Sequence, residues 1–196
     1  MVEGFFTRLT HLGDPLLLLF CGLGVFLHLW GADERRALAR SWALAFGVCL
    51  LLTVAGKFVL HLLRWNEGSA LRLLSPSGHV AIGTGFYGLS AMMIAPQLGR
   101  IARALLWTGI VLLLTLIAIS RLVLDLHSVP EIILAFAIGG ASLAVFVVHA
   151  RNVRSVRLGT GQLVALVLLI AVAFAMPRVS GEAVILHLVR NLVDTP

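Results

Sequence analysis

Charged residues are scarce in this sequence, and their scarcity excludes a water-soluble globular domain. Only 12% of the 196 residues are charged, whereas 60% are hydrophobic and the mean hydropathy is +1.03. A chain of this composition cannot cover a single apolar core with a polar surface. We therefore expect the chain to lie in a lipid bilayer.

Cysteine is also rare, with only Cys21 and Cys49 present. Both fall inside apolar runs, where a cysteine usually serves as a small apolar side chain, so they indicate neither a redox compartment nor a metal site. The net charge is +6, but the basic residues are scattered between apolar runs and form no patch with interleaved aromatic residues. Nucleic acid is therefore not an expected partner.

Long apolar runs dominate the sequence instead. Most of them are long enough to cross about 30 Å of hydrocarbon as helices. The first run is the shortest, with Asp14 and Pro15 marking a helix start and with Leu9 and Leu12 as candidates to lengthen it. No small-residue cleavage site follows it, which predicts that there is no cleavable signal peptide. We predict six transmembrane helices, near residues 15–30, 41–63, 79–95, 102–119, 129–149 and 161–176.

The predicted fold is an all-α membrane bundle that forms one domain over residues 1–196. No repeat or linker divides the chain. The tail is too polar to span, but its apolar residues share one face, which predicts a short interfacial helix near 181–193. Four small residues suit close helix packing within one chain or between two, so the oligomeric state stays open; they are Gly85, Gly88, Ala135 and Gly139.

The arginines indicate how the bundle is oriented. Most of them lie in the connections 31–40, 96–103 and 150–159, which alternate with the connections 64–78 and 120–128. The positive-inside rule makes the arginine-rich side cytoplasmic, so both termini and the other two connections face outward. We expect a multi-pass protein of the plasma membrane, and the preference for arginine over lysine suggests a bacterial source. A site in the outward connections would then be periplasmic.

Ionisable residues near the ends of spans are the first candidates for function, because they are unfavourable in a bilayer. Lys57 is the only lysine, and Arg64 follows it seven residues later on nearly the same helical face. Two cations are thus expected to point in one direction. The alternative for Arg64 is that its side chain only extends to the membrane interface.

The next candidates are Pro76, Ser77, Gly78 and His79, at the start of the third predicted span. A helix start offers unpaired N–H groups and the positive end of its dipole, and Gly78 allows an oxygen-rich anion to approach the backbone. This pattern favours phosphate. The alternative is that Ser77 only caps the helix and His79 is an ordinary interfacial histidine.

The last candidates are Arg121, His127 and Glu131. A carboxylate one helical turn from a histidine can hold one ring nitrogen and leave the other to attack or to bind a proton. Two alternatives compete with this interpretation. Ser128 and Glu131 also form a capping box, and Arg121 and Asp125 have the spacing of a helical ion pair.

Together these three segments resemble the type 2 phosphatidic acid phosphatase superfamily, whose pattern is KxxxxxxRP, PSGH and SRxxxxxHxxxD. The matching stretches are KFVLHLLRW from Lys57, PSGH from Pro76 and SRLVLDLHSVPE from Ser120. Their order, spacing and place on membrane helices all agree with that pattern. Two residues depart from it, since Trp65 replaces the proline and Glu131 replaces the aspartate.

The resemblance implies a phosphatase that forms a phosphohistidine at His127. Glu131 would orient the ring of His127, and His79 would protonate the leaving oxygen. No cofactor and no metal are implied. The implied phosphate ligands are Lys57, Arg64, Ser77, Gly78 and Arg121.

A lipid phosphate is the expected substrate, because the site lies close to the membrane, and membrane lipids are the other expected partners. A polyprenyl diphosphate such as undecaprenyl diphosphate is favoured, with phosphatidate, phosphatidylglycerol phosphate and a lipid A phosphate as alternatives. Two other functions stay open: a lipid phosphotransferase that uses the same intermediate, and a non-enzymatic membrane protein such as a transporter or pseudoenzyme.

Overall fold

A computed structural model describes residues 2–66 and 75–151, without the side chains of residues 2, 3 and 60–66. The elements in these ranges are all helical, and no strand occurs among them, which confirms the all-α fold class. In order they are α1 (Val2–Thr10), η1 (His11–Gly13), α2 (Pro15–Trp30), η2 (Asp33–Arg35), α3 (Arg36–Asn66), α4 (Gly78–Ile94), η3 (Ala95–Gln97), α5 (Arg100–Val123) and α6 (Val129–Ala150).

Five of these helices fall on predicted spans, and their ends have local causes. Asp14 caps α2 by accepting hydrogen bonds from the N–H groups of Leu16 and Leu17, at 3.0 Å each, and Pro15 takes the first helical position. α3 begins at Arg36, earlier than the predicted start at residue 41, because arginine and alanine favour a helix even outside the hydrocarbon. Leu9 and Leu12 lie before α2, in α1 and η1, and they fall within the apolar helical stretch Gly4–Trp30.

The structure supports a membrane protein but does not confirm six spans. Four helical stretches of the described chain are long and apolar enough to cross a bilayer: Gly4–Trp30, Asp33–Val59, Arg100–Val123 and Val129–Ala150. α4 is apolar but has only 17 residues. The predicted sixth span, 161–176, and the tail helix near 181–193 lie outside the described residues.

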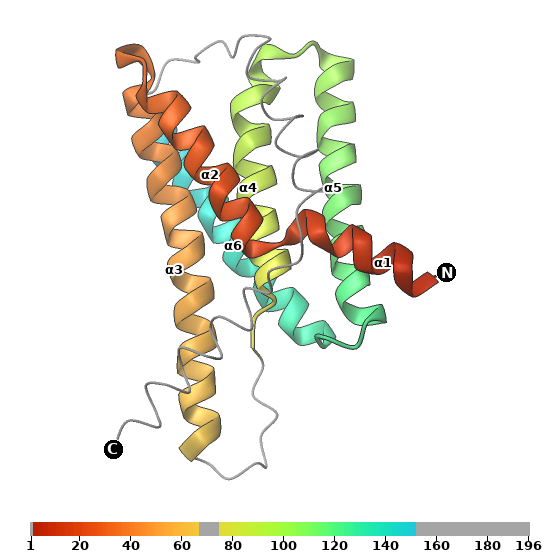
Figure 1. Cartoon of the computed structure of the whole chain (residues 1–196). Helices are drawn as coiled ribbons and strands as arrows, with labels where there is room; N and C mark the ends of the chain where they lie inside the picture. The colour runs from red at the N-terminus through yellow and green to blue at the C-terminus, as the bar shows by residue number, and fades with distance from the viewer. Residues whose placement is uncertain (1, 67–74, 152–196) are drawn as a thin grey trace.

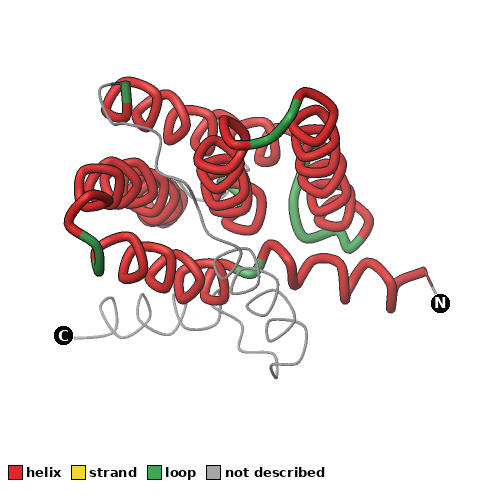
Figure 2. Tube along the Cα trace, turned by 90° about the horizontal axis from the view of Figure 1, so that it is seen from above, coloured by secondary structure: helices red, strands yellow, loops and turns green. Residues whose placement is uncertain are grey.

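α4 forms the centre of the bundle. All its residues from Val80 to Ala91 are buried, and α2, α3, α5 and α6 pack around it (Figures 1 and 2). Glycines let these helices approach closely. A Cβ atom added to Gly85 would lie 2.8 Å from the Sγ atom of Cys49, and one added to Gly139 would lie 2.5 Å from the Cβ atom of Thr84. These small residues therefore serve packing within the chain.

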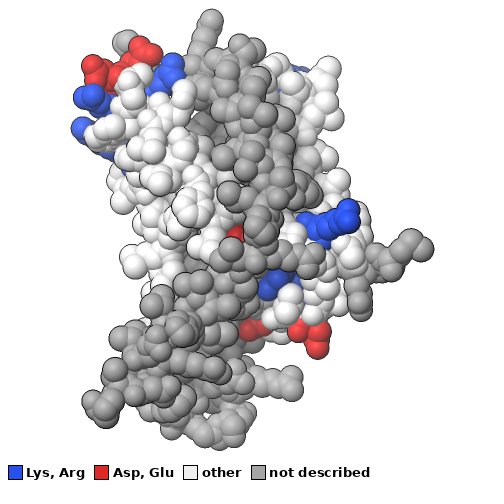
Figure 3. Space-filling view, viewed as in Figure 1, with Lys and Arg blue, Asp and Glu red and all other residues white. Residues whose placement is uncertain are grey.

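The helices of the bundle share one end that holds all three sequence motifs. α3 and α5 finish there, whereas α4 and α6 begin there, in the lower half of Figure 1. α1 runs across the bundle beside α5 rather than along it. Figure 3 shows one group of charged side chains at the upper end and others near mid-height and in the lower half, and the described surface between them is largely uncharged.

Candidate active site

The three motifs, which are far apart in the sequence, meet around His79 at the start of α4. His79 lies within electrostatic reach of Lys57 on α3, Arg121 on α5 and His127 in the connection before α6. His79 is also near His11, in the short η1 helix that precedes α2. The end of the bundle thus gathers histidines and cations from five parts of the chain.

Lys57 points from α3 toward the first residues of α4. A Cβ atom added to Gly78 would lie 3.6 Å from the Cε atom of Lys57, so the lysine side chain lies directly beside the helix start. The same Cβ atom would lie 3.4 Å from the Cγ atom of Pro15, which is an ordinary van der Waals contact. Lys57 therefore adds positive charge where the dipole of α4 is already positive. The side chain of Arg64 lies outside the described residues.

Ser77 stands at the N-cap of α4 but does not cap it. Its side chain makes no capping hydrogen bond, is 0% exposed, and its Oγ atom has no hydrogen-bond partner among the described residues. The first turn of α4 contains no acidic residue, so its N–H groups have no carboxylate partner from that turn. Capping alone does not account for Ser77. A buried hydroxyl without a partner in the described chain, at a helix start with no acidic residue in its first turn, suits an oxygen-rich anion.

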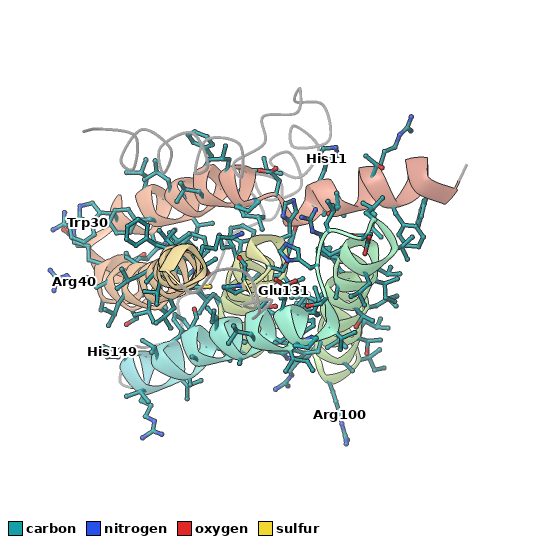
Figure 4. All side chains as sticks on the ribbon, turned by 90° about the horizontal axis from the view of Figure 1, so that it is seen from below. His11, Trp30, Arg40, Arg100, Glu131 and His149 are labelled. Carbon is teal, nitrogen blue, oxygen red and sulfur yellow. The ribbon has the colours of Figure 1, made fainter. Side chains whose placement is uncertain are left out.

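Glu131 holds His127 and two backbone segments together. Its Oε2 atom lies 3.3 Å from the Nδ1 atom of His127 and accepts hydrogen bonds from the N–H group (2.7 Å) and the hydroxyl (3.1 Å) of Ser128. Its Oε1 atom accepts a hydrogen bond from the N–H group of Ser75, at 2.8 Å. The capping contact to Ser128 and the contact to His127 thus exist together, and neither excludes the other. Figure 4 shows Glu131 between the helices, near the centre of this end.

The His127 side chain is only 5% exposed although it belongs to a connection rather than to a helix. Because Glu131 engages Nδ1, the carboxylate fixes the orientation of the ring and separates the roles of its two nitrogens. The arrangement of a buried histidine with a carboxylate on one nitrogen is the one that nucleophilic or acid-base chemistry requires.

The turn that carries the chain from Arg121 to His127 has a defined geometry. Asp125 has a φ of 51°, and it ends α5 in a Schellman motif: the N–H group of Leu126 donates to the carbonyl of Arg121 and that of Asp125 to the carbonyl of Leu122, both at 3.0 Å. Asp125 is exposed and serves to end the helix. The turn directs His127 back toward the bundle.

Arg121 is 4% exposed near the end of α5, and its Nη1 atom donates to the hydroxyl of Thr10 at 3.4 Å. Neither Thr10 nor Ser75 was among the residues predicted to form the site. Ser75 contributes through its backbone, which leaves no side-chain signal in the sequence. Thr10 is distant from every motif, and its contact with Arg121 depends on how α1 crosses the bundle.

The described residues include no group of three or more histidine, cysteine, aspartate or glutamate side chains arranged to hold a metal ion. Independence from metal ions stays a prediction, and the experiment described below tests it directly.

Comparison with known proteins supports the resemblance that the motifs indicate. A model of the PAP2 superfamily matches residues 62–155, just under half of the chain, and this confirms the resemblance. The match includes Arg64, the PSGH motif and the motif that ends at Glu131, whereas Lys57 lies before it. Members of this superfamily are generally phosphatases, so the match supports a phosphoric ester hydrolase in general terms.

The chain is also 28% identical over 165 residues to an uncharacterized 22.5 kDa protein in the cps region of Klebsiella pneumoniae. The alignment covers 82% of this chain and 78% of that protein. No solved structure matches the chain significantly.

Proposed function

We propose that this chain, whose residues 62–155 match the PAP2 superfamily, is an integral membrane phosphatase that hydrolyses a lipid phosphate through a phosphohistidine. One observation carries the proposal: the largely buried pair of His127 and Glu131 lies beside a helix start that has no acidic residue in its first turn. The pair supplies a nucleophile, and the helix start supplies a place for the phosphoryl oxygens.

In the first step, the Nε2 atom of His127 attacks phosphorus. A bond forms between Nε2 and phosphorus, the bond from phosphorus to the leaving oxygen breaks, and that oxygen takes a proton from His79. Glu131 accepts a hydrogen bond from Nδ1 and stabilises the positive charge that develops on the ring. His79 is the histidine at the start of α4, and in this proposal it gives that proton.

In the second step, water attacks phosphorus and transfers a proton to His79. The bond between phosphorus and Nε2 breaks, and inorganic phosphate leaves. Lys57 and Arg121 stabilise the negative oxygens in both steps, with Arg64 as a further predicted ligand. The Ser77 hydroxyl and the N–H groups at Gly78 complete the phosphate cradle.

The site lies where a lipid headgroup would reach it. The outer faces of the surrounding helices are apolar, with exposed residues that include Phe58, Leu122 and Ile133. A lipid tail can remain against such a surface while its phosphate meets the cations. We favour a polyprenyl diphosphate such as undecaprenyl diphosphate, ahead of phosphatidate, phosphatidylglycerol phosphate and a lipid A phosphate.

The proposed orientation follows from the opposite end of the bundle. Exposed arginines gather there, and Figure 4 shows Arg40 and Arg100 projecting outward. The positive-inside rule makes that end cytoplasmic, so the site would face the periplasm of a bacterial plasma membrane.

The decisive experiment measures phosphate release from a panel of lipid phosphates by the purified protein in detergent, with a chelator present. We expect release by the wild type and a loss of at least about 10³-fold in His127→Ala. His149→Ala is the matched control, since His149 is an exposed histidine at the far end of α6. It should retain full activity.

The same measurement separates the alternatives. Release that survives His127→Ala would exclude His127 as the nucleophile. Release only after a second lipid is added as acceptor would indicate a phosphotransferase, and loss of release with the chelator would contradict metal independence. No release from any lipid would favour a non-enzymatic membrane protein.

A further inference from the structure

A short segment outside the matched residues 62–155 lies directly against the candidate site. This N-terminal strap, Thr10–Asp14, includes η1 and joins the crossing helix α1 to α2. η1 packs against α4, and α1 packs against α5. Figures 1 and 2 show α1 meeting α2 near the start of α4. The strap therefore lies beside both His79 and the end of α5.

Three contacts fix the strap in place. The hydroxyl of Tyr87 donates to the carbonyl of Leu12 at 2.7 Å, and Asp14 caps α2. Gly13 is buried, and a Cβ atom added to it would lie 2.9 Å from Cγ2 of Ile117, 3.1 Å from the carbonyl oxygen of His79 and 3.3 Å from Cβ of His79. No side chain fits between Gly13 and His79, so the strap lies in direct contact with His79.

Thr10 connects the strap to the buried cation. Thr10 is 7% exposed, and its hydroxyl accepts a hydrogen bond from the Nη1 atom of Arg121. A guanidinium group has only donors, so in a buried position its orientation depends on the acceptors around it. Thr10 supplies one of these acceptors without neutralising the charge that a phosphate would need.

We propose that the strap Thr10–Asp14 forms one wall of the phosphate site and that Thr10 positions the guanidinium group of Arg121 toward the phosphoryl oxygens. This inference rests on the proposed function, because it takes Arg121 as a phosphate ligand. Thr10 is a positioning residue, since it acts through Arg121. Gly13 sets the distance between the strap and His79.

The first test is a double-mutant cycle between Thr10 and Arg121, measured as phosphate release. Thr10→Val keeps the shape of the side chain but removes the acceptor, and we expect kcat to fall about tenfold with KM little changed. Thr10→Ser restores the acceptor and should recover activity to within about twofold. In the Arg121→Lys background, Thr10→Val should cause no further loss, because its effect passes through the guanidinium group.

The second test moves the strap without removing a polar side chain. Gly13→Ala places a methyl group against Ile117 and His79, and we expect kcat to fall at least tenfold. Gly24→Ala is the matched control on α2, because a Cβ atom there meets nothing within 4 Å. It should leave kcat unchanged.

Two results would overturn the inference: an equal loss from Thr10→Val in both backgrounds, or full activity in Thr10→Val. If the wild type releases no phosphate, the proposed function fails, and the inference is then tested by the rise in unfolding temperature that inorganic phosphate produces. A smaller rise in Thr10→Val than in the wild type would support the strap as part of an anion site. Equal rises, or none in either protein, would contradict it.

Discussion

Two helices, α4 and α6, begin side by side at the candidate site, and they differ in the hydrogen-bond partners available to their first turns. At the start of α6, Ser128 is exposed, and Glu131 in the first turn accepts hydrogen bonds from its N–H group and hydroxyl. At the start of α4, Ser77 is fully buried, makes no capping bond, and has no acidic residue in the turn that follows. The start of α6 thus has a carboxylate partner, Glu131, whereas the first turn of α4 supplies none.

This difference indicates where an anion would bind. A carboxylate near a helix N-terminus interacts favourably with the dipole and with the unpaired N–H groups. α6 already has this stabilisation, so a phosphate would gain little there. α4 lacks it and also has Lys57 beside its first residue. This comparison supports our proposal that the phosphoryl oxygens bind at the start of α4, whereas α6 holds His127 through Glu131.

The largest expected effect comes from making α4 resemble α6. Ser77→Asp places a carboxylate at the N-cap of α4, where it can accept from the same N–H groups that we assign to phosphate. We expect kcat/KM to fall by about 10³-fold because the carboxylate both occupies and repels the anion. Phosphate release, measured together with the unfolding temperature in detergent, checks this.

Ser77→Asn is the control for Ser77→Asp, because it has nearly the same volume and no charge. Its loss should be clearly smaller. If Ser77→Asp folds and binds inorganic phosphate as well as the wild type does, the phosphate does not bind at the start of α4.

A second prediction concerns the negative charge of Glu131 at the start of α6. Glu131→Gln keeps the length of the side chain but offers one acceptor oxygen in place of two, and it no longer stabilises positive charge on the ring of His127. We expect kcat to fall by about 10²-fold, with a small change in KM. Single-turnover measurements of phosphate release would show whether the loss is in the chemical step. Wild-type rates in Glu131→Gln would show that the carboxylate only caps α6.

The sequence predicts the bundle well because apolar runs and helix caps are local signals. The start of α2 at Pro15 and that of α6 at Val129 both coincide with the predicted starts. The choice between a capping and an anion-binding role for Ser77 was not decidable from the sequence, since it depends on burial by other helices.

Long-range contacts explain why the sequence did not indicate Thr10 and Ser75 as residues of the site. Thr10 reaches Arg121 only because α1 crosses beside α5, and Ser75 reaches Glu131 through a backbone N–H group. Neither contact has a periodicity or a motif. The superfamily pattern has an aspartate at the position of Glu131. The pattern did not indicate that the longer glutamate side chain would contact Ser75, just before α4.

A third prediction concerns that longer carboxylate. Glu131→Asp introduces the residue that the superfamily pattern has at this position, on a side chain one methylene shorter. Because Glu131 reaches both His127 and the N–H group of Ser75, we expect the shorter side chain to lose one of these contacts and kcat to fall about tenfold. Turnover of the same lipid by both proteins measures this. A large gain in turnover would instead indicate that Glu131 marks a degenerate site.

The smallest expected effects come from a matched pair of alanine substitutions, one at each helix start. Ser128→Ala removes a hydroxyl that hydrogen-bonds Glu131 at the N-cap, and it should lower the free energy of unfolding by about 1 kcal/mol with little change in kcat. Ser77→Ala removes a hydroxyl that makes no capping bond, so it should leave stability nearly unchanged and lower kcat/KM by about tenfold. Unfolding temperature and phosphate release, measured on both variants, give opposite patterns if the two helix starts differ in function. A loss of stability alone in both variants would mean that Ser77 and Ser128 both serve only to stabilise their helices. The proposal that phosphate binds at the start of α4 would then lose its support.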